Sequence, residues 1–166
     1  MKLKDVSVDA FASLNPALGA VVLWQTCSGY IDVSKRGPPF PLLPVCIPLV
    51  LHQPFGLALN KLSMSMPFFA WIDASPEVVS EFPQIMASYL PVHRASLLFG
   101  LAAGALVIGN DGAVRSVNEG LLRKPGTWAK SESELRRLLQ RARRLGEMLA
   151  AAGAPALILS KLRVAP

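Results

Sequence analysis

The stretch PVHRASLLFGLAAGALVIGNDGAVRSV, residues 91–117, contains two adjoining patterns that decide the fold. Its first part is almost entirely apolar from Pro91 to Gly104, which is typical of a helix surrounded by other elements. Its second part has short apolar runs on both sides of Asp111-Gly112, and an Asp-Gly pair between two such runs favours a β-hairpin. The sequence therefore predicts a buried helix that leads directly into a two-stranded hairpin.

A helix followed by a hairpin is the outline of a winged-helix unit, whose helix usually reads DNA. Base readout requires Arg, Lys, Asn or Gln side chains in the major groove. The apolar helix carries only His93, Arg94 and Ser96 as polar side chains, and these supply too few donors for readout. We therefore expect this unit to hold other proteins.

Helix start and stop patterns predict the elements that precede this unit. Asn15-Pro16 is expected to begin a helix, because Asn is a preferred N-cap and Pro suits the first helical position. Gly29 is expected to end that helix, and the Pro-rich and Gly-containing residues 31–40 are expected to form a loop. Residues 41–52 are apolar on every side and predict the innermost helix.

Shorter helices are predicted next, up to residue 60, around 66–73, and from Ser75-Pro76, with Pro83 and Pro91 interrupting the residues after this last start. The predicted fold class is mainly α, a compact helical domain with a winged-helix-like β-hairpin. We expect one domain over residues 1–166: a helical part at 15–90, a helix plus wing at 91–120, and C-terminal helices packed on it at 130–166.

The clearest single helix is predicted over residues 131–151. Ser131 and Glu134 form a capping box, leucines follow at spacings of three and four, and Gly153 ends the helix. The polar face of this helix carries Arg136, Arg137, Arg141, Arg143 and Arg144. Residues 121–166 have a net charge of +7, whereas residues 1–120 have a net charge of −1. The positive charge of the protein therefore belongs to its C-terminal quarter.

This arginine-rich face has two interpretations, a solvated surface or a docking face for an acidic partner or for DNA phosphates. Arg123 and Lys124 add positive charge in the irregular segment before the helix, and Trp128 in the same segment is the best candidate for an interface anchor. The candidate partner-binding residues are Arg136, Arg137, Arg141, Arg143, Arg144, Trp128, Arg123 and Lys124.

The composition favours burial against a partner. Of the 166 residues, 52% are hydrophobic and only 17% are charged, and the mean hydropathy is +0.40. Soluble monomers rarely expose large apolar patches, so this surplus of apolar residues indicates contact with a partner or a membrane. No run reaches the roughly 20 apolar residues of a membrane span, and the N-terminus lacks the apolar core of a signal peptide. We therefore expect a cytoplasmic protein without membrane contact.

No group of residues predicts catalysis. His52 and His93 have no carboxylate or second ligand at helical spacing, and Cys27 and Cys46 lack the spacing of metal or redox sites. We expect structural histidines, buried free thiols, no bound metal, no cofactor and no small-molecule substrate. The protein is not expected to be an enzyme.

Four segments carry a resemblance to a known family. They are NPALGAVVLW (15–24) with Gly29-Tyr30 after it, PLLPVCIPLVLH (41–52), LLFGLAAGALVI (97–108) with its hairpin, and RRLGEMLAAAGAPALILSKLRVAP (143–166). In their order and spacing they make the chain resemble the middle component of three-component ABC systems with an SMC-like ATPase, a bacterial antiphage group related to Lamassu defence. No catalytic signature belongs to this pattern.

The resemblance implies a small accessory subunit between an SMC-like ABC ATPase and an effector, often a nuclease. A kleisin-like clasp on the ATPase head would suit the winged-helix outline. Our first hypothesis is therefore a noncatalytic adaptor in an antiphage defence complex. The alternative is a DNA-binding winged-helix protein that uses its basic C-terminal helix, and it differs by predicting DNA binding without partners and with strong salt dependence.

Overall fold

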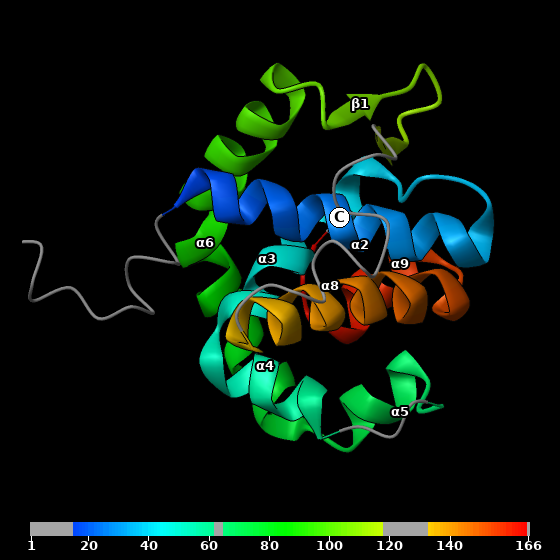
Figure 1. Cartoon of the computed structure of the whole chain (residues 1–166). Coiled ribbons are helices and arrows are strands. Elements are labelled where there is room, and N and C mark those ends of the chain that lie inside the picture. The colour runs from blue at the N-terminus through cyan, green and yellow to red at the C-terminus, as the bar shows by residue number, and fades with distance from the viewer. Residues whose placement is uncertain (1–14, 62–64, 118–132, 166) are drawn as a thin grey trace, which may run out of the picture.

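The described part of the chain is mainly α-helical with one small antiparallel hairpin, which confirms the predicted fold class (Figure 1). A computed structural model describes residues 15–61, 65–117 and 133–165. In chain order the elements are α2 (Pro16–Ser34), the 3₁₀ turn η2 (Phe40–Leu42), α3 (Leu43–Leu51), α4 (Gln53–Asn60), α5 (Phe68–Asp73), α6 (Pro76–Ala102), β1 (Leu106–Ile108), β2 (Val114–Ser116), α8 (Ser133–Ala152) and α9 (Pro155–Lys161).

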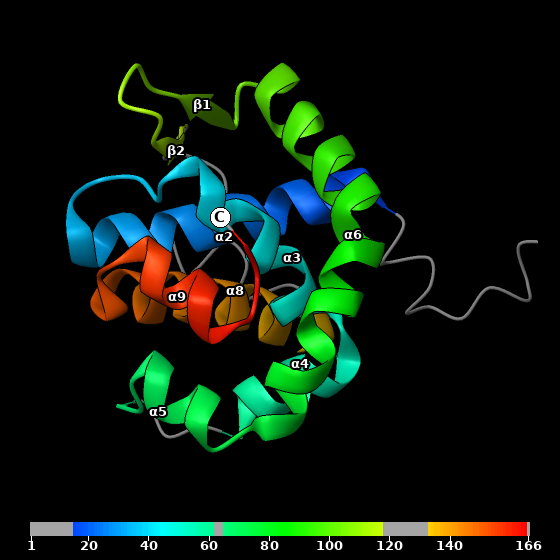
Figure 2. The ribbon, with the colours of Figure 1, turned by 180° about the vertical axis from the view of Figure 1, so that it is seen from behind.

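Helices α2 and α8 lie side by side along much of their length (Figures 1 and 2). Residues 22–30 of α2 are all buried. A Cβ atom added at Gly29 would lie 2.9 Å from the carbonyl carbon of Arg143, and one added at Gly146 would lie 2.8 Å from the backbone nitrogen of Tyr30. The two backbones are therefore in direct contact, because a glycine on each helix leaves room for the other.

The ends of α2 confirm one prediction and correct another. Asn15 caps the helix, since its Oδ1 accepts a hydrogen bond from the Ala17 amide at 3.0 Å. Gly29 does not end the helix, which continues to Ser34 and ends at Lys35 with a φ of 61°. The predicted loop over 31–40 was therefore wrong for its first four residues. Gly29 is glycine because of its contact with α8.

Helix α3 is the innermost helix, as predicted, and its residues 45–50 are buried. At His52, where ψ is 115°, the chain leaves α3 and enters α4. Within the described residues no single helix is long and apolar enough to cross a membrane, and α3 with its preceding turn reaches that length only together with α4, across a bend of 86°.

Helix α6 runs without a break through Pro83 and Pro91, so the predicted interruptions at these prolines were wrong. Each proline removes the helical donor for the carbonyl four residues earlier, at Val79 and Ala87. A helix can bend at such a site and continue, and Figure 2 shows α6 curving along one side of the molecule. Ala87 is exposed, so its carbonyl can bond to water.

The end of α6 is buried on one face only. Ser96 and Gly100 face α2, where a Cβ atom at Gly100 would lie 3.6 Å from the Cβ atom of Ala20. Leu98 and Phe99 are 58% and 50% exposed. The expectation that this helix is buried on all sides was therefore wrong for its outer face, which no described element covers.

The hairpin has the predicted position and turn. Leu106 pairs with Ser116 and Ile108 pairs with Val114, and Gly112 adopts a φ of 70° in the turn. The Trp24 indole donates a hydrogen bond to the Val117 carbonyl at 3.0 Å, which fixes the hairpin to α2.

Candidate partner-binding groove

Helix α8 has one buried face and one polar face. Leu139, Ala142, Leu145 and Leu149 are at most 1% exposed and belong to the core. The arginines lie on the polar face together with Gln140 and Glu147, as the sequence predicted. Ser131 of the predicted capping box lies outside the described residues, and Gly153 ends the helix with a φ of 84°.

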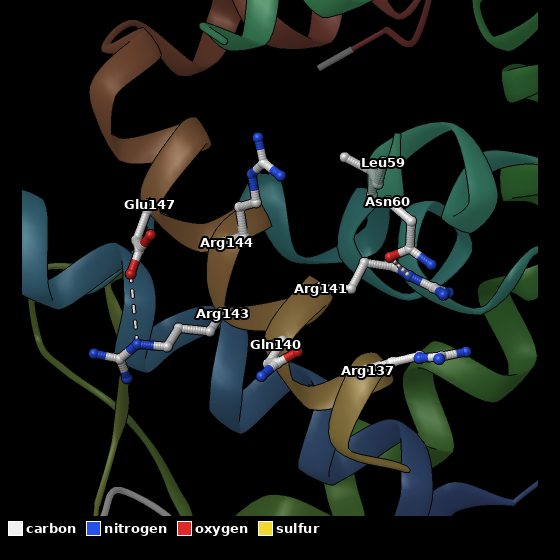
Figure 3. A pocket seen from close by; sticks show the side chains of 8 residues that line it. All are labelled: Leu59, Asn60, Arg137, Gln140, Arg141, Arg143, Arg144 and Glu147. Atoms are coloured by element: carbon white, nitrogen blue, oxygen red, sulfur yellow. Dashed lines mark hydrogen bonds and ion pairs between the residues drawn. The ribbon is translucent and has the colours of Figure 1, made fainter. Parts of the chain in front are cut away.

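A groove of about 750 Å³ lies between the end of α4 and the polar face of α8. It is lined by Leu59, Asn60, Arg137, Gln140, Arg141, Arg143, Arg144 and Glu147 (Figure 3). Four of the five arginines predicted on this helix face therefore meet at one groove. Arg136 is half-buried and is not part of the lining.

Arg141 has a structural role within the groove. Its Nη1 donates a hydrogen bond to the Val50 carbonyl at 2.7 Å, and its Nε donates to Asn60 Oδ1 at 3.2 Å. The Val50 carbonyl lacks a helical donor because Pro54, four residues later, has no N–H. Gly56 makes room for this guanidinium, since a Cβ atom there would lie 2.8 Å from Arg141 Cζ. Arg141 therefore holds the bend between α3 and α4 against α8.

Burial lowers the pKa of Arg141, yet an arginine remains charged at neutral pH because its ordinary pKa lies above 12. The half-buried guanidinium is therefore a fixed positive charge at the floor of the groove.

Arg143 connects α8 to α2. Its Nη2 donates to a carboxylate oxygen of Asp32, and its Nε lies 3.4 Å from Glu147 Oε1. Figure 3 shows the Arg143 and Glu147 pair directed away from Leu59 and Asn60. This pair therefore forms one end of the groove, and its two opposite charges cancel.

Arg137, Arg141 and Arg144 form a stripe on α8, because spacings of four and three residues place side chains on one helix face. Arg137 is exposed and makes no hydrogen bond or ion pair with any residue that the structure describes. Figure 3 shows Arg137 and Arg141 extending from α8 toward α4. The stripe offers guanidinium donors to carboxylates or phosphates.

Sequence reasoning missed one contribution to this region. Asn60 places an amide group beside the arginines, and nothing in the local sequence indicates that the end of α4 meets α8. The other predicted binding residues, Arg123, Lys124 and Trp128, lie outside the described residues.

A second exposed region, which we call the apolar surface, consists of Leu98, Phe99, Val107 and Ile108. These side chains are 58%, 50%, 46% and 42% exposed, and they come from the end of α6 and from β1, which adjoin each other. Sequence reasoning placed the helix part of this surface in the core.

The histidine and cysteine side chains outside the groove pack within the protein. His52 packs edge-on against the Phe55 ring with centroids 4.5 Å apart, and burial lowers the pKa of His93 to about 4. Cys27 and Cys46 are buried free thiols, as predicted, and burial raises the pKa of Cys46 to about 12. The described ranges contain no group of three potential metal ligands.

Comparison with protein-family models matches residues 7–166 to the ABC-three component (ABC-3C) system Middle Component 3. No curated protein and no solved structure matches the chain. Because the family match covers nearly all of the sequence, the chain belongs to the family of ABC-three component system Middle Component 3, and it is an accessory component of a multi-component ABC system with protein partners.

Proposed function

We propose that this chain is a noncatalytic adaptor that links an SMC-like ABC ATPase to an effector, often a nuclease, in a bacterial antiphage defence complex related to Lamassu. We place this complex in the cytoplasm. In this proposal the helix and hairpin at the end of α6 form a winged-helix-like clasp for the ATPase head.

The observation that carries the proposal is the presence of two separate surfaces with different chemistry. The apolar surface lies at the end of α6 and on β1, and the basic groove lies between α4 and α8, with α2 between the two regions (Figure 1). A protein that joins two partners needs two such surfaces on one rigid body. Family membership supplies the expectation of protein partners.

The apolar surface favours protein contact because its residues are costly to leave in water. Leu98 and Phe99 are at least half exposed at the end of α6, and β1, which contacts α6, carries the exposed residues Val107 and Ile108. Burial of apolar area stabilises an interface by roughly 25 cal/mol per Å². A chain with 52% hydrophobic residues retains this area on its exterior, which supports a partner on this surface.

The DNA-binding alternative has less support. A winged helix that reads DNA needs polar side chains on its helix and basic ones on its wing, whereas the outer face of α6 and the strand β1 present apolar side chains. One arginine of α8, Arg143, is already paired with the carboxylates of Asp32 and Glu147. DNA binding therefore stays as an outcome to be tested.

The proposal is tested by co-expressing the tagged chain with the ATPase and effector encoded beside it and measuring recovery of both. The variant Leu98→Ser with Phe99→Ser is expected to lose at least one partner. The matched control is Leu157→Ser on α9, because Leu157 is 49% exposed but lies elsewhere. Recovery of neither partner by the unmodified chain, or a shift of duplex DNA by the chain alone with a steep salt slope, would contradict the adaptor.

A further inference from the structure

We infer that the groove between α4 and α8 binds a short acidic segment of a partner protein, with carboxylates paired to Arg137 and Arg141. This inference rests on the proposed function and names the chemistry of one partner contact. Three features of the groove carry it: its charge, the fixed position of one guanidinium, and its size.

The lining has an excess of positive charge. It contains four arginines and one carboxylate, Glu147, which lies 3.4 Å from Arg143 at one end of the groove. The lining residues alone therefore have a net charge of +3 at neutral pH, and Asp32 of α2, which bonds to Arg143, offsets one of these charges. Closely spaced like charges are unfavourable, and an anion among them relieves this repulsion. The complementary occupant is therefore negatively charged.

The floor of the groove is positioned before any ligand arrives. Arg141 is held by the Val50 carbonyl at 2.7 Å and by Asn60 at 3.2 Å. A guanidinium has five N–H donors, so donors remain for a carboxylate after these two bonds. A fixed arginine loses little conformational entropy on binding, and its planar shape fits a carboxylate with two parallel hydrogen bonds. Arg137 extends toward the same wall and adds a second, exposed guanidinium (Figure 3).

The size and lining of the groove fit a few peptide residues. Its volume of about 750 Å³ lies within the range of small ligand sites. The amides of Asn60 and Gln140 can bond to a peptide backbone, and Leu59 provides an apolar wall. A protein that contacts about 6–10 phosphates gains strong, salt-dependent affinity for a duplex, and the four arginines of this groove offer fewer contacts. The described groove therefore favours an acidic peptide over DNA.

The test uses the full chain and three fluorescent probes: an octaglutamate peptide, an octaserine peptide and a duplex DNA of about 20 base pairs. Fluorescence anisotropy at about 0.15 M ionic strength measures their Kd values. We expect the octaglutamate peptide to bind and the octaserine peptide not to bind. Arg137→Glu should weaken octaglutamate binding by about tenfold or more, because it replaces a charge-assisted hydrogen bond by repulsion.

The control variant is Arg94→Glu, which makes the same charge change at an exposed arginine of α6. Its octaglutamate Kd should change by less than about twofold, since exposed distant charges are screened by salt. Circular dichroism melting of both variants establishes that they fold, which is expected because both side chains are exposed.

Equal weakening by Arg137→Glu and Arg94→Glu would overturn the inference, because it would show attraction by net charge alone. Tighter binding of DNA than of octaglutamate, lost in Arg137→Glu, would overturn it in favour of DNA. Normal co-purification of Arg137→Glu with both partner subunits would overturn it while the adaptor function stands. If the unmodified chain binds no partner subunit, the adaptor function fails. The peptide measurements then still determine whether the groove binds an acidic segment.

Discussion

The contact between α2 and α8 predicts that alanine at position 29 destabilises the protein, whereas helix propensity alone predicts that it stabilises α2. Gly29 lies in the middle of α2, where Gly→Ala should stabilise a helix by about 1 kcal/mol. In this structure the new Cβ atom would lie 2.9 Å from the carbonyl carbon and 3.2 Å from the Cα atom of Arg143. Carbon atoms pack best at about 3.5–4.0 Å, so the two helices would have to separate by roughly 1 Å.

Overpacking of a core typically costs about 1–3 kcal/mol, and the upper end applies here because a helix backbone cannot rotate away as a side chain can. After subtraction of the gain in helix propensity, we expect Gly29→Ala to lower the free energy of unfolding by about 2 kcal/mol. For a domain of this size that corresponds to a fall in Tm of about 4–8 °C. Urea titration and thermal melting measure the two quantities.

Three further variants sharpen this test. Gly146→Ala should cost a similar amount, because its Cβ atom would lie 2.8 Å from the Tyr30 nitrogen. The double variant with Gly29→Ala should lose less than the sum, since one separation of the helices relieves both clashes. Gly100→Ala should cost less than either, because its Cβ atom would meet side chains and no backbone: Leu106 at 2.7 Å and Ala20 at 3.6 Å. A Tm for Gly29→Ala equal to or above that of the unmodified protein would refute the close contact.

The remaining predictions concern single side chains. Arg141→Met should lower the free energy of unfolding in urea by about 1–3 kcal/mol, because it leaves a carbonyl of α3 without its donor, whereas Arg137→Met should change it by less than about 0.5 kcal/mol. His93 has a pKa of about 4 in the folded protein against about 6.5 when unfolded, so unfolding takes up a proton at acidic pH and stability falls as the pH drops from 6.5 toward 4. Between pH 7.5 and 5 the contribution of His93 to the free energy of unfolding falls by about 2 kcal/mol. His93→Asn should remove that part of the pH dependence of stability. An unchanged pH dependence in this variant would show that His93 is not its source. Leu98→Ser with Phe99→Ser should leave the unfolding free energy within about 0.5 kcal/mol and reduce self-association in sedimentation experiments, and a large loss of stability would show that both side chains are buried.

Local rules predicted the elements whose ends depend on nearby residues. Asn15 caps α2 through its own side chain, Gly112 occupies the hairpin turn, and Gly153 ends α8, and each depends on backbone preferences within a few residues. The arginine face of α8 was predicted for the same reason, because helical spacing alone places these side chains together.

Distant contacts explain where local rules were wrong. Gly29 resembles a helix stop, yet its role depends on Arg143 of another helix. Pro91 resembles a helix start, yet α6 passes through it. Leu98 resembles a core residue because apolar pattern does not distinguish a core from a surface that a partner covers.

The structural role of Arg141 could not be predicted from the sequence for a similar reason. Its partner is the Val50 carbonyl, left without a donor by Pro54, and Arg141 and Val50 are 91 residues apart. A helical wheel therefore identifies the arginine face but cannot separate the arginine that holds the fold from the exposed Arg137.

The most direct test of adaptor function asks whether the ATPase and the effector associate without this chain. The two subunits encoded beside it should be purified separately and mixed with or without it, and the masses of the complexes should be measured by size-exclusion chromatography with light scattering. We expect a complex of all three subunits when the chain is present and separate ATPase and effector peaks when it is absent. Association of the ATPase with the effector in its absence would contradict the proposed linking role.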